Sequence, residues 1–377
     1  MTCAFGCSDD TDPATTSGTQ PLDARPVVEN YAAIVHTNYE EIVTTAEALK
    51  TAIDTFVATP SQANLDLART AWLDARTPYG QSESYRFYGG PIDDDDGPEG
   101  RINGWPLDEN YIDYVEGSAM AGIINRPADF PQITKQVIAD NNEIGGEKNL
   151  SAGYHAIEFL LWGQDLNADG PGNRPYTDYV NGGTGTAANQ DRRGQYLTLV
   201  TELLIEDLHS VEEQWEPGEA GTYAAELLAG APEAALSKML TGMGSLSGAE
   251  LSRERMNNAL QEQDQEEEHS CFSDNTLADL LGNALAVENV YLGRYGAVDG
   301  PGIDELVRAR DAALDTKLKG QLTEAIAAIE AIPGTFDQAI LGADGQAKVQ
   351  TAIDALKAVT DTLVEVATLL GVTINLE

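Results

Sequence analysis

The sequence is poor in positive charge. Its 377 residues include 22 lysines and arginines against 62 aspartates and glutamates, a formal net charge of −40 at pH 7. Nucleic-acid binding and electrostatic attachment to anionic lipids both require clustered basic side chains, so this composition argues against both functions. An acidic surface concentrates cations, which we expect among the partners. The same charge also favours solubility in a salty or cold habitat, and the two roles can coexist.

Cysteines and long apolar runs are also scarce. The three cysteines, Cys3, Cys7 and Cys271, are too few for a disulfide framework or a cysteine-rich zinc site. No run of about 18 apolar residues is present, so we expect no transmembrane helix. The segment Ala4–Ser8 resembles the end of a bacterial lipoprotein signal, in which Cys7 carries the lipid. We therefore expect residues 1–25 to form a disordered tether whose only membrane contact is the lipid anchor at Cys7; a short tail with incidental cysteines is the alternative.

Regular alternation of polar and apolar residues, the pattern of β-strands, is absent. Instead, apolar residues recur at three- and four-residue steps over 26–58, after Ser61, and over 191–215, 303–332 and 347–370. We predict an all-α fold of two helical-bundle domains, possibly a duplicated four-helix-bundle-like unit. The segment Glu216-Pro217-Gly218 interrupts the helical pattern. We place the domain boundary there, which gives an N-terminal helical domain over 26–216 and a C-terminal bundle over 217–377.

Histidine is rare as well, and only one of the four histidines, His155, lies in an apolar segment. The stretch Gly153–Gly163 has a helical pattern, with Ser151 as a possible N-cap. His155 and Glu158 are three residues apart and therefore share one helix face. An imidazole and a carboxylate on one face can supply half of a metal site, which needs three or four ligands. Glu83 is the best candidate for a further ligand; a hydrogen-bonded core histidine is the alternative.

Two further patterns fit a metal site poorly. Glu206 and His209 have the spacing of a di-iron ligand pair, but that chemistry requires a second copy, which the sequence lacks. The segment that starts at Asp165 begins like a calcium-binding loop, but its twelfth position is Tyr176 instead of an acid. The H-E-x-x-H helix of zinc peptidases and its reverse are both absent. We interpret the two patterns as a polar helix end and a turn.

The stretch from Gly153 through His155 and Glu158 to Asp165 resembles the G-x-H-x-x-E signature of the imelysin family, in the branch of the iron-regulated protein A type. Further stretches similar to that family follow one another along nearly the whole chain after the tail, at 71–76 with Glu83, 102–107, 264–276 and 289–293. The resemblance implies two bundle-like domains with the motif helix near their junction. It also implies a bacterial envelope protein, held as a lipoprotein on the periplasmic face of the outer membrane or free in the periplasm, that acts in iron uptake with envelope partners.

The resemblance extends to individual residues. It implies His155 and Glu158 as metal ligands faced by Glu83, and it makes the family-typical run Ser273, Asp274 and Asn275 a candidate cofactor-binding segment. The expected ligand is a divalent metal, Fe or Zn, or an iron-bearing ligand. We expect a binding protein rather than an enzyme. The alternative is a zinc metallopeptidase of the insulin-cleaving imelysin type.

Overall fold

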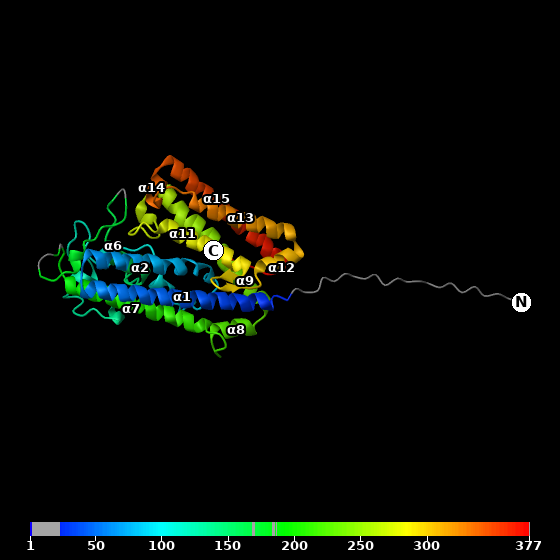
Figure 1. Cartoon of the computed structure of the whole chain (residues 1–377), viewed down its shortest axis with the longest axis horizontal. Coiled ribbons are helices and arrows are strands. Elements are labelled where there is room, and N and C mark those ends of the chain that lie inside the picture. Colours follow the sequence, from blue (N-terminus) through cyan, green and yellow to red (C-terminus); the bar gives the residue numbers. More distant parts are fainter. Residues whose placement is uncertain (2–22, 168–169, 183–184, 186, 377) are drawn as a thin grey trace.

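The computed structural model describes residues 1, 23–167, 170–182, 185 and 187–376. The described residues are overwhelmingly helical, so the predicted all-α fold is confirmed (Figure 1). The strands found in these ranges are β1 (Arg294–Tyr295) and β2 (Val298–Asp299), which form one short antiparallel hairpin. Most of the predicted tether, including Cys3 and Cys7, lies outside the described residues. Within the described ranges, none of the helices has the length and apolar character needed to cross a membrane.

Long helices from the N-terminal half form one layer of the molecule (Figure 1). Helix α1 (Arg25–Ala58) packs against both α2 (Gln62–Gly80) and α7 (Gln190–Glu212) through a nearly continuous apolar face. The Ser61 hydroxyl caps α2 by accepting a hydrogen bond from the Asn64 amide at 3.2 Å. The motif helix α6 (Gly153–Trp162) lies against α2 and α7. Short elements join these helices: η1 (Glu83–Tyr85), α3 (Glu99–Ile102), η2 (Glu109–Tyr111), α4 (Gly122–Asn125), α5 (Lys135–Asn141), η3 (Tyr176–Tyr179) and η4 (Glu213–Trp215).

Helices of the C-terminal half form a second layer. Helix α15 (Ala343–Leu370) packs against α9 (Pro232–Ser245), α13 (Ala312–Glu330) and the π-helical segment η5 (Leu246–Asn257). Helix α11 (Thr276–Leu292) packs against α13 and η5. The remaining helices of this layer are α10 (Asn258–Glu262), η6 (Gln265–Glu267), α12 (Ile303–Arg310) and α14 (Phe336–Leu341), whereas α8 (Tyr223–Ala229) lies beside α1 and η4 of the first layer.

The continuous helix predicted over 303–332 is wrong, because the chain breaks at Asp311 between α12 and α13. Asp311 has an extended conformation, with φ −148° and ψ 93°, and its carboxylate caps α13 by accepting hydrogen bonds from the amides of Ala313 and Leu314 at 3.0 Å each. An aspartate that caps a new helix start offers the backbone an alternative to continued helix. Apolar periodicity on both sides of the break hides it in the sequence.

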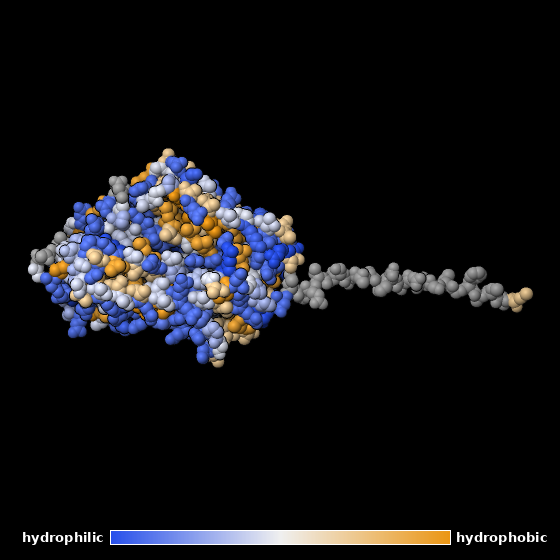
Figure 2. Space-filling model, viewed as in Figure 1, coloured by the Kyte–Doolittle hydropathy of each residue, from blue (hydrophilic) through white to orange (hydrophobic). Residues whose placement is uncertain are grey.

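The two layers meet where α11 packs on α2, and where α9 and α11 contact η1. The motif helix lies on the N-terminal side of this junction, next to α2. In the view of Figure 2, hydrophilic residues cover much of the molecule, and hydrophobic residues gather in the upper part of the face, over the C-terminal helices. The division into domains at residue 216 stays a prediction.

Candidate functional site

The first residue of the motif helix must be glycine. Gly153 has φ +88°, and a Cβ added there would lie 2.6 Å from the carbonyl oxygen of Ile102. The predicted N-cap is wrong: Ser151 instead donates its hydroxyl to the carbonyl of Ile138 at 2.7 Å, and Ala152 occupies the cap position without a side-chain hydrogen bond. The motif glycine therefore lets the backbone at the end of α3 touch the start of α6.

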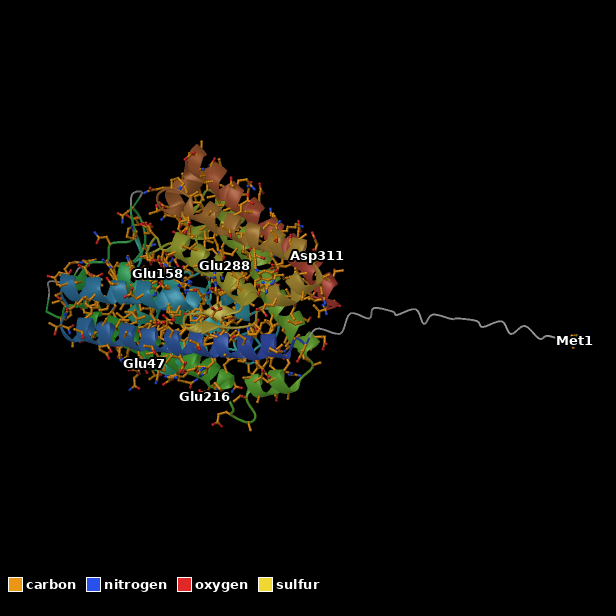
Figure 3. The ribbon with its side chains drawn as sticks, turned by 45° about the vertical axis from the view of Figure 1, so that its right-hand side comes forward. Met1, Glu47, Glu158, Glu216, Glu288 and Asp311 are labelled. Carbon is orange, nitrogen blue, oxygen red and sulfur yellow. The ribbon has the colours of Figure 1, made fainter. Side chains whose placement is uncertain are left out.

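His155 and Glu158 form a buried pair on this helix. The exposed fraction is 1% for His155 and 0% for Glu158. His155 Nδ1 lies 2.8 Å from Glu158 Oε2, and Glu158 Oε1 accepts hydrogen bonds from the backbone amide and the hydroxyl of Ser273 at 2.9 and 2.7 Å. Figure 3 places Glu158 inside the molecule, between the helices of the two layers. Ser273 thus holds the carboxylate, and the carboxylate holds the imidazole.

The electrostatics of the pair favour a neutral imidazole. Burial, and secondarily the charge of Arg76, lower the pKa of His155 to about 3. Burial raises the pKa of Glu158 to about 8, although the hydrogen bonds from Ser273 oppose this shift. When Glu158 is ionised, it accepts the Nδ1 proton of the neutral imidazole, and the other imidazole nitrogen can then bind a metal ion. A bound cation favours this ionised form, against the burial that raises the pKa of Glu158. That other nitrogen, Nε2, is buried and has no hydrogen-bond partner in the part of the chain that the structure describes.

A second histidine stands beside the first. The ring of His269 lies 4.7 Å from that of His155, centroid to centroid, at an interplanar angle of 68°, and Trp105 contacts it edge-on at 6.0 Å. Nδ1 of His269 is buried and also lacks a hydrogen-bond partner among the described residues; its separation from Asp279 Oδ2 is 3.5 Å. Burial, with Arg255 next in importance, lowers the pKa of His269 well below its usual value. The cluster therefore holds two neutral imidazoles, each with a buried nitrogen that makes no hydrogen bond to the described residues.

His269 was not among the site residues predicted from the sequence. A signal was available, because His269 is one of four histidines and lies in the family-like stretch 264–276 that also contains Ser273. The three glutamates directly before it are a composition typical of a surface segment. The structure shows that it is 2% exposed.

Glu83, the predicted third ligand, lies in a different network. It is 1% exposed and accepts hydrogen bonds from Asn103 Nδ2 at 3.0 Å, Arg255 Nη2 at 2.8 Å and Arg86 Nη1 at 3.0 Å. Burial favours the neutral acid, but Arg255 and Arg86 outweigh it and hold the pKa of Glu83 at about 2. Within the described ranges, Glu83 makes no hydrogen bond to His155 or Glu158, and no three His, Cys, Asp or Glu side chains are arranged to hold a metal ion. The set of His155, Glu158 and Glu83 as ligands stays a prediction.

Asn103 links this network to a second buried ion pair. It accepts a hydrogen bond from Arg76 Nη1 at 2.6 Å, and Arg76 Nε donates to Asp279 Oδ1 at 3.2 Å. Arg76 belongs to α2 and Asp279 to α11, so the pair crosses the junction of the two layers. Together the two networks fix the elements that surround both histidines.

The predicted cofactor-binding run precedes α11. Ser273 contacts Glu158, and Asn275 Nδ2 donates to Asp279 Oδ1 at 3.1 Å. Asp274 has φ +59°, and burial, reinforced by the charge of Asp337, raises its pKa to about 7. The run therefore helps to hold Glu158 and Asp279 in place around the two histidines, and its role in binding a cofactor stays a prediction.

A cavity of about 330 Å³ opens beside His269. Its lining combines glutamates, two arginines and Trp105. The lining residues are Arg86, Glu99, Gly100, Asn103, Gly104, Trp105, Pro106, Glu143, Glu147, Leu150, Glu250, Glu254, Arg255 and His269. The cavity therefore borders both the second histidine and the Glu83 network.

The other candidate residues take no part in this cluster. Glu206 pairs with Lys135, and His209 Nδ1 lies 2.8 Å from Glu212 Oε2 with 44% of its side chain exposed. Of the calcium-like segment, Ala168 and Asp169 lie outside the described residues. Cys271 is buried, and burial raises the pKa of its thiol well above the usual value.

Comparisons with known proteins agree with this architecture. The family model described as Imelysin (Peptidase_M75) matches residues 35–363. Iron-regulated protein A of Synechococcus elongatus is 25% identical over 354 residues, which cover 92% of this chain and 86% of that protein. The crystal structure of a putative iron-regulated protein A precursor from Parabacteroides distasonis is similar with a TM-score of 0.74 at 20% identity, covering 94% of this chain and 97% of that one. An imelysin-like protein from Psychrobacter arcticum gives a TM-score of 0.67 at 14% identity, covering 93% and 96%. Since the family model spans most of the sequence, the chain belongs to the imelysin family.

Proposed function

We propose that this imelysin-family protein acts in iron acquisition by binding a metal ion, or a metal-bearing ligand, beside the G-x-H-x-x-E helix. The relationship to a protein named iron-regulated protein A supports the link to iron. The observation that carries the proposal is the pair of adjacent, buried imidazoles of His155 and His269, each with a nitrogen that makes no hydrogen bond to the described residues. Buried polar atoms are normally hydrogen-bonded, so two orphaned nitrogens in contacting rings are best explained by a missing ligand.

The chemistry of these donors suits a transition metal. Imidazole nitrogen is a ligand for both Fe and Zn, and it binds metal in its neutral form. Glu158 orients His155 from the other side of the ring, as carboxylates commonly do for metal-bound histidines. Two donors are fewer than the three or four of a closed protein site. The remaining positions fall to water or to atoms of the ligand, as expected for a site that releases its cargo.

Binding is favoured over peptidase activity. A metallopeptidase needs a general base that can reach a metal-bound water. Glu158 is the acid of the motif, but His155 engages its Oε2 and Ser273 engages its Oε1. With both oxygens committed, this carboxylate serves better to position the imidazole than to take a proton from water.

Equilibrium metal binding tests the proposal. The protein is stripped with a chelator and titrated with Fe²⁺ under anaerobic conditions and, separately, with Zn²⁺. We expect one tight site in wild type that is weakened at least about tenfold in His155→Ala and in His269→Ala, the usual cost of losing a ligand or its support. His209→Ala removes an exposed histidine and should bind as wild type. Unchanged binding in His155→Ala would refute the proposal.

We also propose that Cys7 is lipidated and holds the protein at the bacterial envelope, near iron-uptake partners. The support is the lipoprotein-like stretch Ala4–Ser8. Mass spectrometry of the protein isolated from membranes should find the lipid on Cys7. A protein recovered from the membrane-free fraction without added mass would contradict this placement.

A further inference from the structure

The cavity beside His269 is strongly acidic. Five glutamates line it, Glu99, Glu143, Glu147, Glu250 and Glu254, against two arginines. With His269 neutral, the lining carries a net charge of −3 when all five glutamates are ionised. Such a wall attracts cations and repels anions, and a low-dielectric cleft strengthens both effects.

The two arginines offer little to an anion. Arg255 is bound by Glu83 at 2.8 Å and by Glu250 at 3.3 Å. Arg86 is bound by Glu83 at 3.0 Å and by Glu99 at 3.0 Å. In the described part of the chain, one buried N–H of Arg86, at Nε, is left over. The guanidiniums are therefore neutralised by carboxylates, and they do not form a site for a carboxylate or phosphate ligand.

The glutamates that line the cavity lie at different depths, from exposed to half-buried. Glu143 and Glu147 are exposed and form no ion pair with a basic side chain among the described residues, whereas Glu250 and Glu254 are half-buried. Glu143 leans over α3, since a Cβ at Gly100 would lie 2.9 Å from its Oε1. At the buried end stands the His269 ring, 2% exposed, which lines the cavity and contacts the ring of His155; its Nδ1 lies 3.5 Å from Asp279 Oδ2 without a hydrogen bond. A buried imidazole in the lining with a nitrogen that makes no hydrogen bond distinguishes this cavity from an ordinary acidic surface.

The backbone that carries these acids also indicates a functional site. Glu250, Glu254 and Arg255 all come from the π-helical segment η5. π-Helical turns are rare and occur frequently at functional sites, where they redirect side chains that a regular helix would place elsewhere. Here the segment delivers two carboxylates and the guanidinium that holds Glu83 to the same cavity.

We infer that this cavity admits a hydrated metal cation to His269, whose ring contacts that of His155, and excludes anionic complexes such as ferric citrate and haem. The inference rests on the proposed function and names its ligand class. The volume agrees, because a metal ion with six waters occupies about 180 Å³ at about 30 Å³ per water, within the 330 Å³ available.

The association rate of Fe²⁺ tests whether the cation enters through this cavity. The double variant Glu143→Gln/Glu147→Gln removes two carboxylates at the mouth, and Glu324→Gln/Glu330→Gln removes two exposed ones on α13 as the matched control. Anaerobic Fe²⁺ is mixed with each protein in a stopped-flow instrument, and quenching of Trp105, which contacts His269, reports arrival. We expect the mouth variant to associate about 3–10-fold more slowly at low salt, with an unchanged dissociation rate and no difference at 1 M salt. The control should behave as wild type.

The outcomes separate this inference from the proposed function. Equal association rates in the mouth variant and wild type would overturn the path. Binding of ferric citrate or haemin that is lost in His155→Ala would overturn the exclusion of anionic complexes while leaving the proposed function intact. A wild type that binds neither Fe²⁺ nor Zn²⁺ nor these complexes would overturn both.

Discussion

Replacing Glu83 by glutamine separates a structural role for this acid from a role as metal ligand. The substitution preserves shape but removes the charge that compensates Arg255 and Arg86, which bond to Glu83 at 2.8 and 3.0 Å. Breaking a buried ion pair by removing one partner costs about 3–5 kcal/mol, because the other charge stays buried. For a chain of this length, at about 2.1 cal/mol/K per residue, that loss lowers the melting temperature by about 4–6 °C if unfolding is one transition.

The assay is thermal and urea unfolding followed by circular dichroism, in buffer with excess chelator. We expect the full loss of stability under these metal-free conditions, whereas Glu324→Gln, an exposed acid, should change stability by less than about 0.5 kcal/mol. A Glu83→Gln protein that is as stable as wild type without metal, and is weaker only in metal binding, would refute the structural role and restore Glu83 as a ligand.

Three further predictions concern residues that hold the two histidines in place. The pKa of Glu83 falls from about 4.5 to about 2 on folding. The stability advantage of wild type over Glu83→Gln should therefore be full above pH 4.5 and shrink as the pH falls towards 2, which unfolding measurements over this pH range can show. Gly153→Ala should lower the free energy of unfolding by more than about 2 kcal/mol, because the new Cβ would meet Ile102 and φ at this position is positive. In the same unfolding assay, Gly320→Ala, at an exposed helical position with open space, should raise it by up to about 1 kcal/mol. Ser273→Ala should lose about 1–2 kcal/mol through the hydroxyl bond to Glu158, and Ser273→Thr should recover part of it; equal urea midpoints for all three proteins would contradict this.

Helical periodicity was enough to predict the fold class and most long helices. Apolar steps of three and four residues located α1 and α2, and Ser61 marked the start of α2. The break at Asp311 was hidden, because residues on both sides keep the helical pattern. The glycine of the motif could be seen in the sequence, but its reason could not, since the contact with Ile102 joins residues 51 positions apart.

The site was predictable only along one helix. The His155–Glu158 pair follows from three-residue spacing, and the 2.8 Å bond agrees with it. Partners that come from distant segments, such as His269, cannot be read from spacing. Glu83 shows the opposite problem: its acidity and aromatic surroundings suit a ligand equally well as an ion-pair partner, and only the positions of Arg255 and Arg86 show what it contacts.

The central claim is that a metal ion binds between His155 and His269. Anomalous diffraction from crystals soaked in Fe²⁺ or Zn²⁺ tests it most directly. We predict a single strong peak about 2.0–2.2 Å from one nitrogen of each ring, and its loss in crystals of His269→Ala. A peak only at the outer glutamates, or none in a fully soaked crystal, would contradict the account.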